Sequence, residues 1–471
     1  MELNNHWINI PLEDLTVHVI GGDWGKESDF IEDGYEAVAC IRGSEFKHWK
    51  IDFGRTAVIR KIKISSMKTR ALLKGDILVE ISGGGPEQPV GRTVLISDTV
   101  LKQHNLPVVC TNFIRMMRLA PCINSVFVNR YLELFYLSGE VIKYQGGSNN
   151  LRNLKFKDYS KINIPLPSYA EQKIIADKLD DLLARVESIK TRLENIPEIL
   201  KKFRQSVLSA AMSGKLTEEW RNSDSFGENL FLGDLIFSGP QNGLYKPTSF
   251  YGRGTKIIRI DSFYDGEIID WEKIKKVELS KDELDKWALR KNDVLINRVN
   301  SIEYLGKCAL VKSIPSECVF ESNIMRMSLI EEKVIPEYII LYLCSQKGIF
   351  ELRKNAKLAV NQASINQNDV KNCIILLPNI NEQKEIIRRV NMYFSYADKV
   401  SENVFRALSK VNIIDQAILA KAFRGELTAQ WREENPELIS GLNSAEALLE
   451  KITAEKLAAG TLKKRAKKTS H

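Results

Sequence analysis

The sequence predicts an α+β protein with an internal repeat, in which each of two mixed α/β domains is followed by one long helix. Two observations support this fold. Two motifs each occur twice, and the copies are IPLPSYAEQKIIADKL (164–179) with ILLPNINEQKEIIRRV (375–390), and SGKLTEEWR (213–221) with RGELTAQWR (424–432). Both motifs have the same offset of 211 residues, from Gln172 to Gln383 and from Trp220 to Trp431. Because loops change length between copies, this constant spacing indicates a continuous helix between the motifs.

The residues between the two motifs have the apolar pattern of a long helix. In both copies apolar residues recur at alternating steps of four and three, which is the heptad pattern of a helix that packs along one seam. We therefore predict two equivalent helices. Their seams are formed by Ile175, Leu179, Leu182, Val186, Ile189 and Leu193 in the first copy, and by Ile386, Val390, Ala397, Val400 and Val404 in the second.

The ends of both predicted helices carry start and stop signals. Ser168 and Asn379 each stand three residues before a glutamate, so we expect a capping box in which the glutamate bonds back to the backbone N–H of the cap residue. Gly214 and Gly425 follow the apolar pattern and suit a left-handed helix end. Pro197 lies inside the first helix and is expected to kink or briefly break it.

The regions before the two helices repeat only loosely. TNFIRM (111–116) matches SNIMRM (322–327). The stretches 17–70 and 236–288 do not align. Short β-like runs, helical stretches and many glycines predict a small α/β domain with exposed loops. The predicted boundaries are a first domain at 1–165, a central helical region at 166–224, a second domain at 225–376, a C-terminal helical region at 377–435, and a helical extension with a basic tail at 436–471.

The charge distribution is local rather than global. The chain of 471 residues has a net charge of +8, but five of its Lys and Arg lie in the last eleven residues, which leaves +3 for the rest. Ten Lys and Arg lie between 42 and 74 against two acids, and four lie between 246 and 259 against none. Such clusters are the expected footprint of contact with a phosphate backbone, although a solvated surface has the same composition.

The sequence contains no recognisable active site. It has no GxxxxGK[ST] phosphate loop and no NPPY or DPPY methyltransferase tetrapeptide. The ExK tripeptides that begin at Glu45 and Glu331 could suggest a nuclease, but neither has a counterpart in the other copy. Seven cysteines and five histidines show no metal-ligand spacing, so we expect no metal and reduced thiols in a cytoplasmic protein. With no signal-peptide pattern at Met1 to Ile10 and no apolar run near the ~20 residues of a membrane span, no membrane partner is expected.

The repeated motifs resemble those of a known family. LPSYAEQKII followed by a heptad helix and SGKLTEEWR, repeated as LPNINEQKEII and RGELTAQWR, is similar to the specificity subunit of type I restriction–modification enzymes, over essentially the whole chain. The resemblance implies two target recognition domains separated by two helices in an antiparallel coiled coil, with a pseudo-two-fold axis. It implies a non-catalytic subunit that reads a bipartite, asymmetric sequence in double-stranded DNA, while the coiled coil sets the spacer.

The resemblance also implies partners and cofactors outside this chain. Two methyltransferase subunits that use S-adenosylmethionine would bind it, together with a translocase–nuclease that uses ATP and Mg in a full complex. Trp220 and Trp431 at the helix ends could dock the methyltransferase or anchor helix to domain. A helical stretch at 445–458 could pack on a partner or fold back. Two other classes remain open, a stand-alone DNA-binding scaffold and a nuclease with an unrecognised site.

The candidate DNA contacts lie in the basic parts of the two domains that do not align. Arg and Lys can contact guanine edges or phosphates, and Gln can contact adenine. In the family, a loop before the last strand carries a Gln near DNA, and Gln362 matches it, whereas the first domain has Gly146 to Leu151 there without Gln. The candidates are Trp24, Lys26, Arg42, Lys47, Lys50, Arg55, Tyr245, Lys246, Tyr251, Arg253, Lys256, Arg259 and Gln362.

Overall fold

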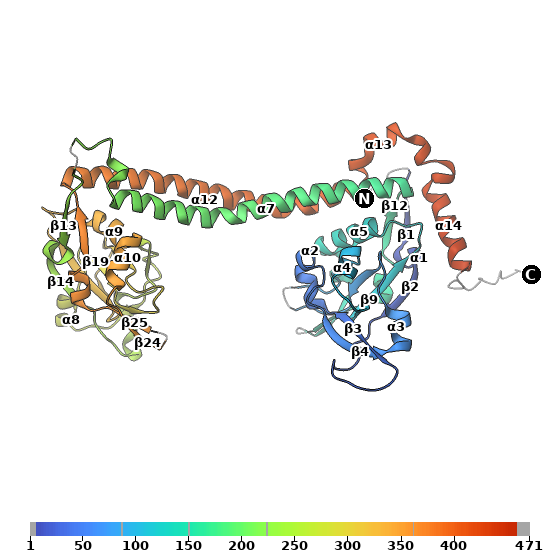
Figure 1. Cartoon of the computed structure of the whole chain (residues 1–471), viewed down its shortest axis with the longest axis horizontal. Helices are drawn as coiled ribbons and strands as arrows, with labels where there is room; N and C mark the ends of the chain where they lie inside the picture. The colour runs from blue at the N-terminus through green and yellow to red at the C-terminus, as the bar shows by residue number, and fades with distance from the viewer. Residues whose placement is uncertain (1–5, 86–87, 149–150, 223–224, 361, 459–471) are drawn as a thin grey trace, which may run out of the picture. The chain divides into compact units, whose positions relative to one another are not determined.

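The computed structural model describes residues 6–85, 88–148, 151–222, 225–360 and 362–458. The chain divides into two compact units: unit 1 is Met1–Thr191 with Leu408–His471, and unit 2 is Arg192–Ala407. Both boundaries fall inside the long helices labelled α7 and α12 in Figure 1, so each unit contains one α/β domain with parts of both helices. The predicted basic tail at Lys463 to Lys468 lies outside the described residues.

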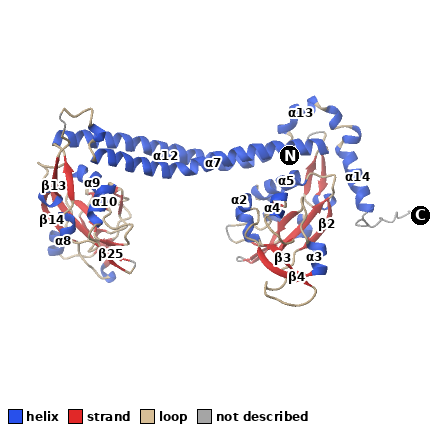
Figure 2. Ribbon diagram, in the orientation of Figure 1, coloured by secondary structure: helices blue, strands red, loops and turns tan. Residues whose placement is uncertain are grey.

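The first α/β domain, which we call head 1, is built from four small sheets (Figure 2). Its main sheet has the strand order β2-β9-β5-β7 and its second sheet the order β4-β3-β8, in which β3 and β8 are parallel. Its strands are β1 (Ile8–Pro11), β2 (Thr16–Gly21), β3 (Tyr35–Ile41), β4 (Val58–Lys63), β5 (Ile77–Glu80), β6 (Ser82–Gly83), β7 (Thr93–Leu95), β8 (Val108–Cys110), β9 (Ile114–Leu119), β10 (Gln145–Ser148), β11 (Leu151–Leu154) and β12 (Asn163–Leu166). Its α-helices are α1 (Leu12–Leu15), α2 (Trp49–Asp52), α3 (Ile64–Arg70), α4 (Asp98–Lys102), α5 (Ser125–Leu137) and α6 (Phe156–Tyr159).

The second α/β domain, head 2, repeats this plan. Its main sheet has the order β14-β23-β19-β21, extended by β17 and β16, and its second sheet the order β18-β15-β22. Its strands are β13 (Glu228–Phe231), β14 (Ile236–Asn242), β15 (Tyr251–Ile258), β16 (Phe263–Tyr264), β17 (Gly266–Ile268), β18 (Lys276–Val277), β19 (Val294–Asn297), β20 (Val299–Asn300), β21 (Cys308–Leu310), β22 (Cys318–Phe320), β23 (Ile324–Leu329), β24 (Lys357–Ala359), β25 (Gln362–Ser364) and β26 (Ile374–Leu377). Its helices are the 3-10 helix η4 (Leu232–Leu235), α8 (Lys281–Trp287), α9 (Pro336–Cys344), α10 (Gln346–Arg353) and α11 (Gln367–Lys371).

The two heads share one topology even where their sequences do not align. The stretch 17–70 forms β2, β3, β4 and α3, and the stretch 236–288 forms β14, β15, β18 and α8 in the same order. Strand β3 is antiparallel to β4 and parallel to β8, and β15 is antiparallel to β18 and parallel to β22. The prediction of a common scaffold is therefore confirmed, and it extends further than the sequence match.

One sequence match is displaced by a residue in the structure. Asp76 and Asp293 are equivalent, because each accepts a hydrogen bond of 2.7 Å from the backbone N–H three residues earlier, just before β5 and β19. Three residues after each aspartate, Val79 pairs with Arg115 and Ile296 pairs with Met325, so Arg115 and Met325 are equivalent in the structure. The sequence match of TNFIRM to SNIMRM instead aligns Arg115 with Arg326. A shift of one residue moves a strand side chain to the other face of its sheet. The two arginines therefore face opposite sides of their main sheets.

The two long helices have equal length and the predicted starts. Helix α7 (Tyr169–Met212) and helix α12 (Ile380–Phe423) each contain 44 residues. Ser168 Oγ accepts from the backbone N–H three residues on at 3.2 Å, and Asn379 Oδ1 does so at 3.0 Å, so both N-caps are confirmed. Helix α7 runs through Pro197 as one helix, so a break there is wrong, and a kink at Pro197 stays a prediction.

Both long helices also end as predicted. Gly214 follows α7 with φ of 78°, and Gly425 follows α12 with φ of 77°. This left-handed backbone conformation favours glycine because a Cβ would crowd the carbonyl oxygen. The helix-stop predictions at both glycines are therefore confirmed.

The glutamates of the two predicted capping boxes have another role in the structure. In unit 1 the buried Glu171 carboxylate accepts from Thr428 Oγ1 at 2.6 Å, Arg432 Nη1 at 2.5 Å and Trp7 Nε1 at 3.0 Å. A second nitrogen of Arg432 donates to the carbonyl of Gly425 at 2.7 Å. The start of α7 thus binds the motif that follows α12. The expected hydrogen bond from the glutamate back to the cap residue is wrong, because these donors take up the carboxylate.

Unit 2 contains the equivalent junction. Glu382 at the start of α12 accepts from Thr217 Oγ1 and from Arg221 Nε, both at 2.8 Å. Arg221 also donates to the carbonyl of Gly214 at 2.6 Å. In both units the threonine and arginine of the LT..WR motif thus bind the glutamate of the EQ motif, and the arginine also donates to the carbonyl of the glycine before them. Since each long helix is held in this way at both ends, its length cannot drift between copies.

The glutamine of the EQ motif joins each long helix to its head. Gln172 accepts from the backbone N–H of Asn124 at 3.0 Å and donates to the carbonyl of Pro167 at 3.0 Å. Gln383 accepts from the N–H of Ile335 at 2.9 Å and donates to the carbonyl of Pro378 at 2.8 Å. The position of each head relative to the start of its helix is therefore fixed by the same side chain.

Within each unit the start of one long helix packs against the end of the other in an antiparallel direction. In unit 1, Ile175, Leu179 and Leu183 share a core with Leu419, Ala422 and Phe423. In unit 2, Val207, Leu208, Ala211 and Met212 share a core with Ile386 and Val390. Along the first seam Leu182, Val186 and Leu193 are partly buried, and Ile189 is 50 % exposed. Along the second, Ala397 and Val404 are buried and Val400 is partly buried, and a continuous coiled coil stays a prediction.

The predicted C-terminal helix folds back onto head 1. Helix α14 (Ala445–Ala458) buries Leu448 and Ile452 in the core of unit 1. The Nζ of Lys456 donates to the carbonyls of Glu13 at 2.8 Å and Asp14 at 3.0 Å. Of the two alternatives for this segment, the structure supports folding back.

We predict that Glu382→Ala destabilises unit 2 by about 3–5 kcal/mol, because it leaves the buried Arg221 guanidinium without its carboxylate. Urea unfolding, monitored by hydrogen exchange in the first turns of α12, would measure the loss of stability. Arg185→Ala, which breaks an exposed pair with Asp181, is the control and should change little. Equal effects of the two substitutions would contradict the importance of the junction.

Candidate DNA interface

In each head one end of the main sheet meets the long helix, and the other end carries most of the candidate residues. The helix end of head 1 is marked by the bond from Asn124 to Gln172. At the opposite end lie the last residues of β2 and β5 and the first residues of β7 and β9. We call this end, with the loops and the hairpin beside it, the distal edge. Within the described part of the chain it comprises residues 21–27, 42–46, 55–56, 80–85, 88–93, 145–148 and 151–154 in head 1, and residues 242–246, 259–262, 297–307, 357–360 and 362–364 in head 2.

An exposed aromatic residue occupies the same loop position in both heads. Gly22 and Gly243 both donate a backbone N–H to the first residue of the strand beside them, and a Cβ at either would lie 2.1–2.2 Å from a carbonyl oxygen. Two residues later stand Trp24, which is 37 % exposed, and Tyr245, which is 76 % exposed. The Arg60 guanidinium lies 4.2 Å from the Trp24 ring centroid and fixes that ring. The pattern Gly-x-aromatic is the signal that could have aligned these loops.

A partly exposed arginine also occupies an equivalent position in both heads. Arg42 directly follows Ile41, the last residue of β3 that pairs with β8. Arg259 directly follows Ile258, the last residue of β15 that pairs with β22. Arg42 Nε donates to Glu45 at 3.0 Å, and Arg259 Nε donates to Glu321 at 3.2 Å. A carboxylate that holds the guanidinium fixes its direction, which is how bidentate recognition of a base or phosphate is prepared.

Several candidates are held inside head 2 by their own contacts. Lys246 forms an ion pair of 2.8 Å with Glu283, and Lys256 donates to the carbonyl of Trp271 at 2.7 Å. Tyr251 packs on the buried cluster around Leu244, and burial raises the pKa of its hydroxyl. The sequence cannot distinguish such structural lysines from surface ones. In this conformation, Lys246 and Lys256 have a structural role in head 2.

Other candidates extend into solvent. Arg253 is 85 % exposed and pairs with Glu278, while Arg55 and Lys50 make longer pairs of 3.7 Å with Asp52 and 3.8 Å with Glu133. Lys26 and Lys47 are exposed, and Lys26 lies 5.7 Å from the ring centroid of Phe30. Exposed ion pairs contribute little to stability, so these cations can exchange their partners for phosphates.

The hairpin at each distal edge is common to both heads. In head 2 the hairpin of β24 and β25 joins β20 through β25, and in head 1 the hairpin of β10 and β11 joins β6 through β11. Gln362 is exposed at the tip of β25, next to the exposed Val360. Leu151 of head 1 takes the strand position of Gln362, because Ser148 pairs with Leu151 as Ala359 pairs with Gln362. The hairpin is therefore shared, and a DNA contact by Gln362 stays a prediction.

Some buried polar atoms that the structure describes near the distal edges have no partner, which the sequence did not predict. Among the described residues, Thr93 Oγ1, Arg115 Nε and Gln145 Nε2 in head 1 have no hydrogen-bond partner. In head 2 the same is true of both amide atoms of Asn297 and of Arg298 Nε. Buried polar atoms are normally paired, so these atoms have hydrogen-bonding capacity that water or a ligand can meet.

The two distal edges differ in chemistry at equivalent positions. At the end of β5, Glu80 binds Arg92 with bonds of 2.6 and 2.9 Å. At the equivalent end of β19 stands Asn297, and the Arg92 position is taken by Lys307, whose Nζ lies 3.5 Å from the Tyr264 ring centroid. Burial lowers the pKa of Lys307. At equivalent positions the shared scaffold thus buries the carboxylate of Glu80 in head 1 and the amide of Asn297 in head 2.

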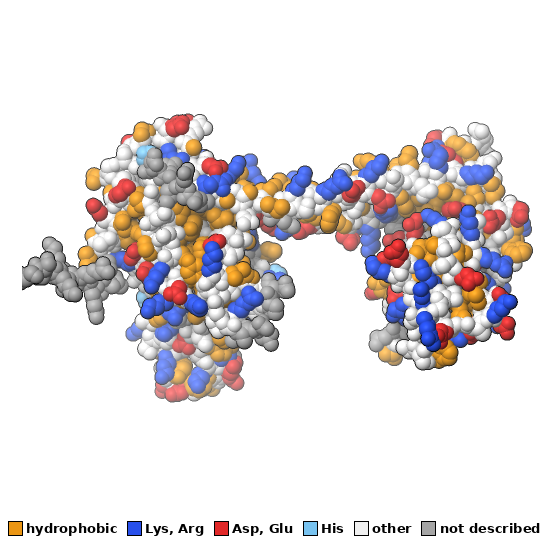
Figure 3. All heavy atoms as spheres, turned by 180° about the vertical axis from the view of Figure 1, so that it is seen from behind, with side chains coloured by type: hydrophobic (Ala, Val, Ile, Leu, Met, Phe, Trp, Pro, Cys, Tyr) orange, Lys and Arg blue, Asp and Glu red, His pale blue; other side chains and the backbone are white. Residues whose placement is uncertain are grey.

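The surface charge is mixed in the view of Figure 3. Blue Lys and Arg side chains are interspersed with red acidic side chains over both units, so neither presents one uniform basic face there. Among the described residues, no group of three or more His, Cys, Asp and Glu could hold a metal ion. No helix of the described part of the chain is long and apolar enough to cross a membrane.

The protein has two heads of the same topology, each joined to long helices, and the distal edges of the heads differ. This arrangement is that of a recognition protein with two reading domains. The family model "Type I restriction modification DNA specificity domain" matches twice, at 31–198 and 228–402. The chain belongs to this family, whose members are the specificity subunits of type I restriction–modification systems.

Individual relatives agree with this assignment. The chain is 37 % identical over 476 residues to the type I restriction enzyme EcoKI specificity subunit of Escherichia coli strain K12, covering 99 % of each chain. It is 36 % identical over 474 residues to the StySPI specificity subunit of Salmonella potsdam, again covering 99 % of each. Among solved structures, the HsdS subunit of Thermoanaerobacter tengcongensis matches with a TM-score of 0.55 at 16 % identity, covering 90 % of this chain and 98 % of that one. A chain from a type I R-M system matches with a TM-score of 0.59 at 16 % identity, covering 90 % and 100 %.

We predict opposite consequences for two neighbouring cations of head 2. Arg253→Ala should weaken binding to duplex DNA uniformly across sequences and reduce the slope of log K against log salt by about one, because an exposed arginine neutralises a phosphate. Lys256→Met should lower the melting temperature and leave the salt slope unchanged, because its amine bonds inside the head. A titration of labelled duplex at several salt concentrations, with thermal melts, would measure both. Reversed results would contradict the assignment of the exposed face.

Proposed function

We propose that each head reads one half of a bipartite, asymmetric sequence in double-stranded DNA through its distal edge. The observation that carries the proposal is the pairing of one scaffold with different exposed side chains at equivalent positions, such as Trp24 and Tyr245. A common scaffold brings two edges to the duplex in the same way, and different side chains there select different bases. The target is therefore asymmetric.

The chemistry of the edges suits direct readout. Arg42 and Arg259 can donate two hydrogen bonds to guanine, and Gln362 can bond to adenine. The exposed Arg253, Arg55 and Lys47 suit phosphates, which fix position without specifying sequence. These roles are proposals. Arg42, Arg259 and Gln362 lie at the distal edges, whereas Arg253 lies in β15 outside them.

We propose further that the long helices set the distance between the half-sites and bind the enzyme partners. A helix of 44 residues spans about 66 Å at 1.5 Å per residue. As a specificity subunit the chain acts with DNA and with methyltransferase subunits, for which we propose two copies. S-adenosylmethionine would bind the methyltransferase, and ATP and Mg a restriction subunit where one is present, while this chain holds no cofactor.

The first test is methylation-aware sequencing of host DNA with and without this gene, with its methyltransferase left in place. We expect a split, asymmetric motif with methylated adenines that disappears on deletion. An unchanged methylation map, with sequence-specific binding by the purified chain, would instead favour a stand-alone DNA-binding protein. Cleavage or methylation by the pure chain alone would contradict a non-catalytic role.

We predict that seven residues inserted into the middle of one long helix change the spacer or prevent assembly, and leave both half-sites unchanged. The physical reason is that the heads carry the base contacts, whereas the helices carry only length and register. The methylated motif of the variant would be read by the same sequencing. A changed half-site would show that the helices do more than set the distance.

A further inference from the structure

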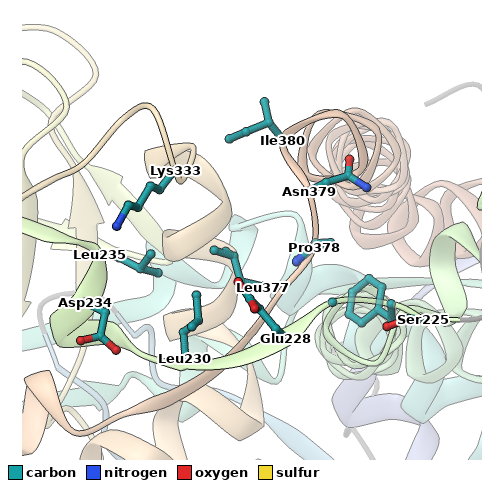
Figure 4. A pocket seen from close by; sticks show the side chains of 12 residues that line it. Ser225, Glu228, Leu230, Asp234, Leu235, Lys333, Leu377, Pro378, Asn379 and Ile380 are labelled. Atoms are coloured by element: carbon teal, nitrogen blue, oxygen red, sulfur yellow. The ribbon is translucent and has the colours of Figure 1, made fainter.

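A hollow of about 760 Å³ lies in unit 2 where head 2 meets the start of α12 (Figure 4). Its apolar floor is formed by Leu230, Leu235 and Leu377. In Figure 4 the side chains of Lys333 and Asp234 lie on one side of these leucines. The proposed DNA-reading edge is at the opposite end of the head, so the hollow is separate from the reading surface. It adjoins the junction, because Pro378 and Asn379 of its lining contact Gln383 and Glu382.

The same surface exists in head 1 with a similar apolar floor. Strand β1 pairs with β12 as β13 pairs with β26, and α1 precedes β2 as η4 precedes β14. The equivalent residues are Ile10 and Leu230, Leu15 and Leu235, Leu166 and Leu377, and Asp14 and Asp234. All three apolar positions are therefore kept in both heads.

In head 1 this surface is covered by the chain's own helix α14. Leu448 and Ile452 are buried in one core with Ile10, Leu15 and Leu166. In the last turn Lys456 Nζ donates to the carbonyls of the two acidic residues of α1 at 2.8 and 3.0 Å. Its neighbour Glu455 accepts from Cys122 Sγ at 3.6 Å. Helix α14 thus presents an apolar stripe that ends in an acid followed by a lysine.

Head 2 keeps the acceptors for such a helix and adds a charge. The backbone of Gly233 and Asp234 stands where Glu13 and Asp14 offer their carbonyls to Lys456. Counted from the equivalent bonds of Asn124 and Ile335 to the helix glutamines, Lys333 takes the place of Cys122. A carboxylate at the position of Glu455 would therefore meet an ammonium group. Within the described part of the chain, no helix covers this surface.

We propose that the hollow of head 2 binds an amphipathic helix of a partner protein with the chemistry of α14: apolar residues four apart, followed in the last turn by an acid and a lysine. The apolar stripe would fill the leucine floor, the acid would pair with Lys333, and the lysine would bond to the carbonyls of η4. The inference does not depend on DNA reading, because the residues involved lie at the helix end of the head.

The experiment uses the full chain and a labelled peptide of residues 441–458 as the probe, followed by fluorescence anisotropy. We expect one binding site per chain. Lys333→Glu should weaken binding about tenfold, because it places two carboxylates together. A peptide carrying Glu455→Lys should restore the affinity of that variant. Lys281→Glu, which changes an exposed lysine of α8, is the matched control and should have no effect.

Each other outcome overturns the proposal. Absence of binding would mean that the hollow does not accept this helix chemistry. Binding that is insensitive to Lys333→Glu would mean that the peptide displaces α14 from head 1. Self-association of the chain that Lys333→Glu abolishes, measured by sedimentation velocity, would assign the hollow to a second copy of the chain. Because Lys333 is exposed, its substitution leaves the fold intact and keeps these outcomes separable.

Discussion

The structure depends on two buried carboxylates, Glu171 and Glu382, each at the first turn of a long helix. A buried carboxylate is costly unless it is paired and fully hydrogen-bonded. Here the threonine and arginine of the motif that ends the other helix supply those bonds. The start of each helix is thus tied to the end of the other, and both repeated motifs are explained by one contact. The neighbouring glutamine then joins each head to the start of its helix, so the junction positions both the long helix and the head.

The heads show how a fixed scaffold can carry variable recognition. Strand order, strand direction and the position of the hairpin agree between them, whereas the side chains at the distal edges differ. Glu80 with Arg92 and Asn297 with Lys307 occupy the same places with different hydrogen-bonding chemistry. Several of the polar atoms described there are buried without partners, so they have hydrogen-bonding capacity that a ligand or water can meet. Because the distal edges and the junctions lie at opposite ends of the heads, side chains at an edge can change without disturbing the junction.

The repeat is not symmetric at the helix ends of the heads. Helix α14 covers one face of head 1, and the equivalent face of head 2 is a hollow with an apolar floor and a lysine beside it. The Lys333 ammonium at the place of Cys122 changes the chemistry from neutral to charged. This difference gives the two halves distinct binding surfaces, although their topology is the same.

The repeat, the equal helix lengths, the N-caps and the helix stops could all be predicted from the sequence, because local and periodic signals specify them. The sequence also identified the family through the two repeated motifs. Tertiary structure decided the rest. The role of Glu171 could not be predicted, because its partner Arg432 is distant in the chain. Lys256 bonds inside its head whereas Arg253 faces solvent. This difference depends on strand pairing, which cannot be predicted from composition. Likewise, the common fold of 17–70 and 236–288 rests on backbone pairing that many side chains satisfy.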